Sequence, residues 1–165
     1  WPARLFADLI NQFKIRYPAQ MILVGAADNQ ETARAVCAAV RGEIIDLTGQ
    51  TPLAQFVRLM RRCTLLVSND SGPVHVADAA GTPVISIFTR NQPGINPERW
   101  RPLGKYSAFV APPQDLTRDF SKGEISEADY LEKVALSDVV AAVDAVYKLC
   151  YNQRSFLPNI TCSNI

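Results

Sequence analysis

The sequence predicts an α/β domain with a doubly wound parallel sheet, in which helices cover both faces of the sheet. Three observations predict it. Short apolar runs alternate with helical patterns along the chain, and this alternation favours parallel strands joined by crossover helices. The length of 165 residues fits one such domain better than two. With 48% hydrophobic and 20% charged residues, the chain can also form a substantial core. Right-handed crossovers would make the domain Rossmann-like.

The first elements follow from local signals. A helix is expected over residues 2–17, where apolar side chains recur at helical spacing. The run QMILVG at residues 20–25 predicts a short buried strand. QETARAVCAAVRG predicts a helix over residues 30–42 with Gly42 as its stop signal, and EIIDL predicts a strand over residues 43–47.

The middle of the chain repeats this alternation. Thr51 is the expected N-cap, with Pro52 at the first helical position, of an amphipathic helix over residues 53–63. TLLVSN at residues 64–69 predicts a strand, and GPVHVADAAG at residues 72–81 predicts a short helix of small residues.

The last elements are less regular. PVISIF at residues 83–88 predicts a strand, and residues 89–105 form a polar, proline-rich loop. A further strand is expected at YSAFVA, residues 106–111, and a final helix at residues 137–151. The predicted domain covers residues 1–150.

Two segments stand apart from this pattern. Residues 112–136, with two adjacent prolines and many charges, are expected to be a surface insertion, and residues 151–165 a weakly patterned C-terminal tail. The start carries no signal-peptide pattern and lacks methionine, which indicates an excised piece of a longer cytoplasmic protein.

Composition excludes several function classes. The net charge of +1 gives no electrostatic case for nucleic-acid binding, and apolar runs are too short to span a bilayer. The four cysteines lack CxxC spacing and are expected to be reduced core thiols, among them Cys37 and Cys63. We expect neither a metal site nor a cofactor.

The corner NDSGPVH suggests an anion site. Asp70, Ser71 and Gly72 follow a predicted strand and begin a helix, where free amides and the helix dipole favour negative charge. Gly72 lets a phosphate approach the backbone, Ser71 adds a hydroxyl donor, and the imidazole of His75, the single histidine, can lean back over them. Asp70 is expected to cap the helix.

Other interpretations of this corner were weighed. A capped helix with an exposed His75 and no ligand remains open. Ser71, His75 and Asp78 match a hydrolase triad in residue type, but all lie on one helical segment, whereas triad members converge from separate elements. Asp70 could be the phosphoacceptor of a receiver-like signalling switch, but that switch needs an acidic pair after the first strand, which ends here LVGAADN.

The run LVSNDSGPVHVADAAGTPVISIF resembles the nucleotide-sugar-binding domain of glycosyltransferase family 9, the ADP-heptose lipopolysaccharide heptosyltransferases and their relatives. The family pattern is a strand, Asp-Ser/Thr-Gly-x-x-His, small residues and Gly-x-Pro before the next strand. WPARLFADLI, ILVGAADNQE and TGQTPLAQFVRLMRRC are similar to further family segments. The resemblance covers roughly residues 1–93 and the final helix.

The resemblance implies a C-terminal, donor-binding domain, one half of a GT-B fold whose N-terminal domain supplies the catalytic base. It implies that the corner binds the donor diphosphate, and that a second set of residues lies near the base and the ribose of the donor. The implied diphosphate residues are Asp70, Ser71, Gly72, Pro73, Val74 and His75. The implied base and ribose residues are Thr51, Glu31, Asn29 and Asp28. For Thr51 an N-cap, and for Glu31 an ordinary helical first turn, remain alternatives.

The sequence departs from the family pattern after ISIF. Where the family reads Gly-Pro-Thr, this chain has Thr89, Arg90 and Asn91, which are expected at the cleft. Arg90 could pair with phosphate or with an anionic acceptor.

The implied function is an inverting transferase for a sugar, implied to be heptose, from a nucleoside diphosphate sugar to a lipopolysaccharide-type acceptor at the membrane surface. The enzyme would be cytoplasmic or peripheral to the inner membrane. The alternatives are a nucleotide-binding module without transferase activity and the receiver-like switch.

Overall fold

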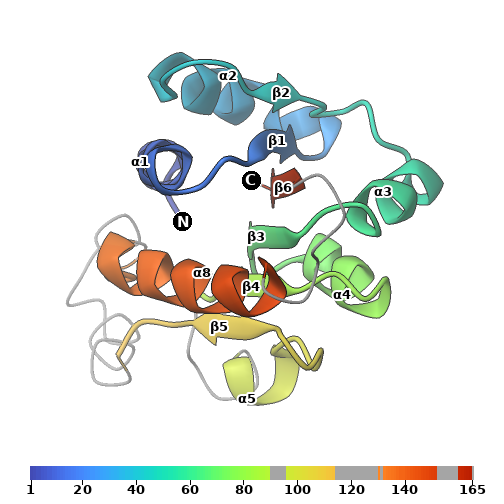
Figure 1. Ribbon diagram of the computed structural model, residues 1–165, viewed down its shortest axis with the longest axis vertical. Coiled ribbons are helices and arrows are strands. Elements are labelled where there is room, and N and C mark those ends of the chain that lie inside the picture. The colour runs from blue at the N-terminus through green and yellow to red at the C-terminus, as the bar shows by residue number, and fades with distance from the viewer. Residues whose placement is uncertain (90–95, 114–129, 131, 152–159, 165) are drawn as a thin grey trace.

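The computed structural model describes residues 1–89, 96–113, 130, 132–151 and 160–164, with the backbone alone for 151 and 160–164. A six-stranded sheet runs through the middle, in the order β2-β1-β6-β3-β4-β5, and its strand pairs are parallel (Figure 1). The strands are β1 (Gln20–Val24), β2 (Ile45–Asp46), β3 (Leu65–Asn69), β4 (Val84–Ile87), β5 (Ala108–Val110) and β6 (Ile160–Asn164). The helices are α1 (Ala3–Arg16), η1 (Ala27–Asn29), α2 (Gln30–Ala39), α3 (Leu53–Met60), α4 (Gly72–Ala79), α5 (Pro97–Trp100) and α8 (Leu136–Tyr151).

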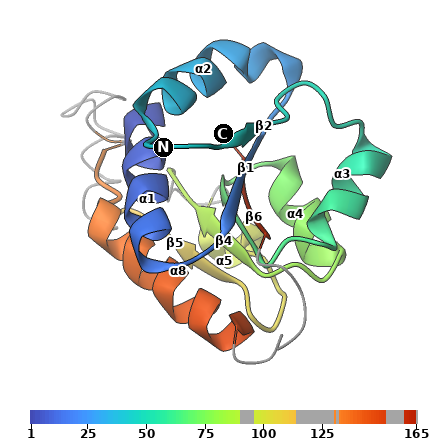
Figure 2. The same ribbon diagram turned by 45° about the horizontal axis from the view of Figure 1, so that its top comes forward.

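Helices cover both faces of the sheet, and each face has its own core. On β1, Leu23 packs into a cluster with α1, α2 and α8, whereas Ile22 packs into a second cluster with α3 and α4. Adjacent residues of β3 divide in the same way, Leu65 to the first cluster and Leu66 to the second. Successive side chains of a strand point to opposite faces, so the apolar strands have no solvent-facing side. Figure 2 shows the two helical layers on either side of the strands.

The predicted doubly wound α/β fold is therefore confirmed, and the observed bounds of the predicted elements lie within three residues of the predicted ones. The N-cap of helix α3 is Pro52 and not Thr51, one residue later than predicted. The four-residue helix α5 lies inside the segment that the sequence assigns to a loop.

The C-terminal segment contributes to the sheet. Strand β6 pairs with β1 on one side and with β3 on the other, so residues 160–164 lie at the centre of the sheet. Their weak apolar pattern gave no sign of this position. The predicted insertion at residues 112–136 lies largely outside the described residues.

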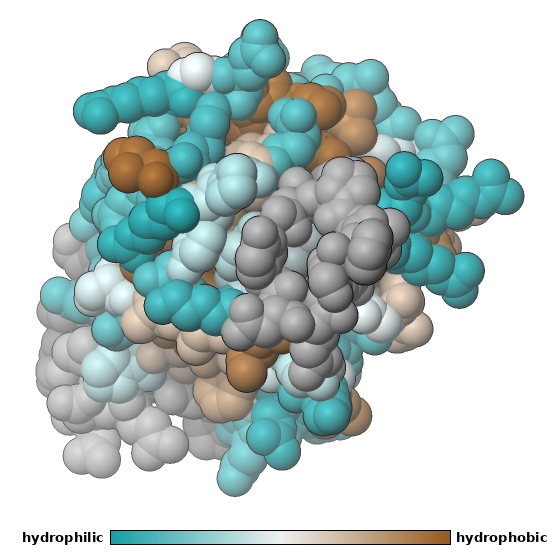
Figure 3. Space-filling model, in the orientation of Figure 1, coloured by the Kyte–Doolittle hydropathy of each residue, from teal (hydrophilic) through white to brown (hydrophobic). Residues whose placement is uncertain are grey.

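The expectation of reduced core thiols is wrong for Cys63, which is buried and disulfide-bonded, while Cys37 carries a free thiol. Within the described residues, no helix is long and apolar enough to cross a membrane. Hydrophilic side chains predominate on the face drawn in Figure 3, where apolar atoms lie in separate patches, as on an ordinary protein surface.

Candidate functional site

The site lies where the sheet changes its winding direction. From β1 the chain crosses through α2 to the outer strand β2, whereas from β3 it crosses through α4 to β4 on the other side. Helices α2 and α4 belong to the clusters on opposite faces. The carboxyl ends of β1 and β3 therefore flank a topological switch point, which is where ligands bind in open α/β sheets.

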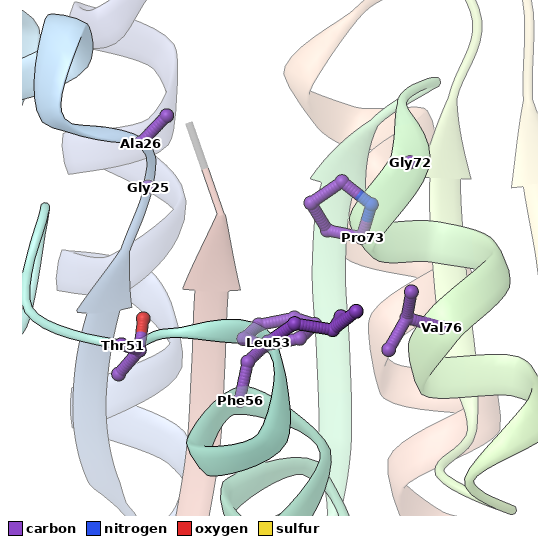
Figure 4. A pocket seen from close by; sticks show the side chains of 8 residues that line it. All are labelled: Gly25, Ala26, Thr51, Leu53, Phe56, Gly72, Pro73 and Val76. Atoms are coloured by element: carbon purple, nitrogen blue, oxygen red, sulfur yellow. The ribbon is translucent and has the colours of Figure 1, made fainter.

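A pocket of about 360 Å³ opens at this switch point (Figure 4). The end of β1, the start of α3 and the first turns of α4 form its wall. The side chains of Leu53 and Phe56 on α3 lie on the side that faces Pro73 and Val76 of α4. The lining residues are Gly25, Ala26, Thr51, Leu53, Phe56, Gly72, Pro73 and Val76.

The start of α4 lines this pocket. Ser71 is the N-cap in an extended conformation, but its side chain makes no capping hydrogen bond to the described residues. Its Oγ instead donates to the carbonyl of Asn69 at 3.1 Å. The first-turn amides of an uncapped helix are good partners for an anion.

Gly72 is not required by the fold. Its φ lies outside the left-handed region, and a Cβ built on it would have no described atom within 4 Å. By contrast, Gly81 at the other end of the helix has a φ of +84°, a conformation that favours glycine. The missing side chain at Gly72 therefore leaves space for a ligand and relieves no strain.

Asp70 does not cap α4 as the sequence predicted, because the N-cap position belongs to Ser71. The Asp70 amide donates to the Ile87 carbonyl at 3.0 Å. Partial burial raises the pKa of the Asp70 carboxyl above its ordinary value, and the nearby His75 offsets part of that rise.

His75 is exposed on the second turn of α4. Its ring meets the ring of Trp100 edge-on, with centroids 6.2 Å apart and an interplanar angle of 60°. Val74, the preceding residue, is fully buried among the side chains under α3 and α4, and its amide donates to the Ser71 carbonyl at 3.0 Å. Val74 thus shapes the helix start and offers no side chain to a ligand.

The predicted base and ribose residues are only partly brought together. Thr51 lines the pocket. Asn29 lies beside it, because its Oδ1 accepts a hydrogen bond of 3.2 Å from the amide of Ala26. Asp28 and Glu31 are exposed in the same turn after β1, and neither lines the pocket.

The predicted cleft segment is described only at Thr89, which is half-buried after β4. Arg90 and Asn91 lie outside the described residues.

Asp78 has a structural role at the far end of α4. Its carboxylate accepts hydrogen bonds from the amides of Leu103 and Gly104 at 2.8 and 3.0 Å, and from Ser107 Oγ at 2.7 Å. Ser107 Oγ in turn accepts from the amide of Val84 at 3.1 Å. Asp78 thus ties α4 to the segment before β5, and its engagement there argues against the triad with Ser71 and His75.

Sequence reasoning missed the apolar wall of the pocket, Leu53, Phe56 and Val76. Leu53 shares the helical spacing of Phe56 and Met60, which predicts an inward position, but in the structure it is 68% exposed. Among the described residues, no group of three or more His, Cys, Asp or Glu could hold a metal ion.

The raised pKa of Asp70 predicts a pH-dependent stability. The Asp70 carboxyl contributes to stability below its ordinary pKa of 3.8, where it is protonated. This contribution is lost as the pH rises through the raised pKa of the folded state. Asp70→Asn should therefore raise the free energy of unfolding at pH 7 by a few tenths of a kcal/mol, since solvent screens a half-exposed charge. The gain should vanish near pH 3.

Urea unfolding across this pH range measures the effect. Asp8→Asn on α1 removes the same charge from an exposed surface position and serves as the control. A stability gain for Asp70→Asn that is equal at pH 3 and pH 7 would contradict the assignment.

The chain is similar to known proteins in sequence and in fold. The sequence profile of glycosyltransferase family 9 (heptosyltransferase) matches residues 1–128. Lipopolysaccharide heptosyltransferase 2 of Salmonella typhimurium is 34% identical over 101 residues, 59% of this chain and 29% of that protein. The enzyme of the same name from Escherichia coli K12 has the same identity and coverage.

Two solved structures share the fold. A family 9 glycosyl transferase from Veillonella parvula superposes with a TM-score of 0.74 at 24% identity, and E. coli ADP-heptose lipopolysaccharide heptosyltransferase II with a TM-score of 0.72 at 25% identity. Each match covers 90% of this chain and 42% of the other. The chain therefore spans less than half the length of these relatives.

Proposed function

Because the chain belongs to glycosyltransferase family 9, we propose that it is the donor-binding domain of an inverting glycosyltransferase. The domain comprises residues 1–150 together with the central strand β6, and it forms one half of a GT-B fold. The start of α4, from Asp70 to His75, binds the diphosphate of a nucleoside diphosphate sugar.

One observation carries this proposal: α4 begins without a side-chain cap from the described residues, beside a pocket at the switch point, and its first residue, Gly72, faces open space. A phosphate there can approach the Gly72 amide closely, and the helix dipole adds to the attraction. The His75 imidazole supplies a further donor, and the Ser71 hydroxyl can donate as well once it turns away from the Asn69 carbonyl.

The apolar part of the pocket suits the nucleoside. Leu53, Phe56 and Val76 present an apolar wall next to the polar helix start, and a planar base packs well against such a wall. Thr51 lies beside the base, and Asn29, with Asp28 and Glu31 in the same turn, lies toward the ribose hydroxyls. A volume of about 360 Å³ is within the range of small-ligand sites.

The chemistry follows from this placement. An acceptor hydroxyl, deprotonated by a base in the N-terminal domain, attacks the anomeric carbon from the side opposite the diphosphate, so the configuration inverts. The helix start and His75 stabilise the negative charge that develops on the departing diphosphate.

We further propose a heptose donated from ADP-heptose and a lipopolysaccharide-type acceptor, for which the names of the relatives are the support. The enzyme then works in the cytoplasm or at the inner face of the inner membrane, where such an acceptor is supplied. Thr89, Arg90 and Asn91 would face the cleft between the two domains.

Calorimetric titration of this chain with ADP, UDP and GDP tests the proposal. We expect at least one of them to bind more tightly than 1 mM, on the order of −4 kcal/mol, and the matching nucleoside without phosphates to bind more weakly. No detectable binding of any of the three would overturn the diphosphate assignment.

His75→Ala should weaken binding of the preferred nucleoside diphosphate by about 1–2 kcal/mol, because it removes a hydrogen bond to a charged group at an exposed position. Lys148→Ala, which removes an exposed cation from α8, is the control and should leave the affinity for the nucleoside diphosphate unchanged. Equal affinity of His75→Ala and wild type would remove His75 from the site.

The alternative of a binding module without transferase activity predicts the same titrations. Assay of the full-length enzyme separates the two, since only the transferase consumes the sugar nucleotide when an acceptor is present.

A further inference from the structure

Trp100 is placed to orient the one histidine of the chain. It closes the short helix α5, which is distant in sequence from α4, yet its ring meets the His75 ring edge-on at 6.2 Å between centroids. Edge-to-face pairs at this separation are attractive, because the positive rim of one ring meets the negative face of the other.

The segment that carries Trp100 is held on both sides. At the start of α5, Asn96 caps the helix by accepting a hydrogen bond of 3.3 Å from the Arg99 amide, and the next residue, Pro97, is buried. Shortly after α5, the Asp78 carboxylate fixes Leu103 by its hydrogen bond of 2.8 Å. The Arg99 guanidinium lies over the indole at 5.3 Å, a cation–π contact that also restrains the ring. Trp100 thus lies on a segment that hydrogen bonds hold in place at the start of α5 and shortly after it.

His75 needs such a restraint. It lies on an exposed face of α4, where an imidazole is free to sample several rotamers, and only some of them lean toward the start of the helix. Holding one rotamer before the ligand arrives lowers the entropy cost of binding. Trp100 remains 43% exposed, so a large aromatic side chain stays partly in water beside the proposed diphosphate site.

We propose that Trp100 is a positioning residue, which holds the His75 imidazole in the orientation that meets the donor diphosphate. This rests on the proposed function of the site, but the contact itself can be tested without any nucleotide. The expected gain in affinity is the value of one aromatic pair, roughly two- to tenfold.

The first experiment follows the His75 side chain by NMR. Since the chain has a single histidine, its imidazole Cε1–H resonance is unambiguous. Trp100→Ala should move this resonance to the position of a solvent-exposed histidine, whereas Trp100→Phe, which keeps a ring edge, should retain much of the wild-type displacement. The same resonance position in wild type and Trp100→Ala would overturn the proposal.

The second experiment is a double-mutant cycle, which measures the affinity of each variant for the nucleoside diphosphate that wild type prefers. Trp100→Ala should weaken binding roughly two- to tenfold, and Trp100→Phe should restore most of it. In the His75→Ala background, Trp100→Ala should have no further effect. A loss that persists there would overturn the positioning role and indicate a direct contact between Trp100 and the nucleotide.

Thermal unfolding of each variant separates a folding defect from a local change, since a positioning role predicts an NMR shift with no more than the small decrease in melting temperature that the loss of one aromatic pair causes. If Trp100→Ala moves the His75 resonance but wild type binds no nucleotide, the contact is supported and the proposed function is overturned instead. Wild-type binding with affinity unchanged in Trp100→Ala would support the proposed function and overturn the positioning role.

Discussion

Gly72→Ala is expected to weaken nucleoside diphosphate binding by about 2–3 kcal/mol while the domain remains as stable as wild type. The added methyl group would point into the open space beside the first turn of α4, where the phosphate must approach the backbone. Overfilling a fitted space typically costs this much. The domain itself should tolerate the change, because the backbone of Gly72 suits alanine and alanine is the better helix former.

Gly81→Ala, just beyond the C-cap of the same helix, is the matched control, with the opposite expectation. Its positive φ of +84° should make alanine cost about 1–2 kcal/mol of stability, with the affinity of the folded protein unchanged. Calorimetry for affinity and urea unfolding for stability measure both variants. If Gly72→Ala lowers stability and leaves binding intact, the glycine has a folding role and the proposed site is wrong.

Asp78→Ala is expected to lower the free energy of unfolding by about 2–4 kcal/mol. It removes the shared acceptor of the Leu103 and Gly104 amides and of Ser107 Oγ. The Gly104 amide and Ser107 Oγ are partly buried, and each such donor left without a partner costs about 1 kcal/mol or more. The contact around Gly104 is close, since a Cβ there would clash with the Asp78 carboxylate and lie 2.9 Å from Ser107 Oγ. Few rearrangements can therefore replace the lost acceptor.

Glu132→Ala is the control for removal of an acidic side chain. Glu132 forms an ion pair with Arg4 at 2.6 Å, but the two side chains are 48% and 57% exposed, and such surface pairs contribute little. Its loss should change stability by less than about 0.5 kcal/mol. If urea unfolding showed Asp78→Ala to be no more destabilising than Glu132→Ala, the hydrogen bonds of the Asp78 carboxylate would not hold the segment before β5.

The sequence was sufficient for the fold class, because apolar alternation and helix stop signals are local. The short runs that became β1, β3 and β4 are buried on both faces, and this is why they read as continuous apolar segments. At Asp70 to His75, a strand end followed directly by a helix start also predicts an anion site from the backbone alone, and this stays a prediction.

Other features depend on residues that are far apart in sequence. The pocket wall joins Gly25, Leu53 and Val76, which three separate elements bring together only when the sheet forms. The contact between Trp100 and His75 and the acceptor role of Asp78 likewise join segments more than twenty residues apart. Strand β6 gave no local signal, because its place between β1 and β3 is set by pairing with neighbours and not by its own pattern.

The sequence by itself thus determined the alternating elements, the doubly wound class and the helix start that faces the site, since each arises from backbone and neighbour preferences within a few residues. Only the tertiary structure decided that Ser71 and not Asp70 is the N-cap, that Leu53 faces the pocket, and that Trp100 meets His75. These depend on the relative placement of whole elements, which is set by packing across the sheet and cannot be read from any one segment.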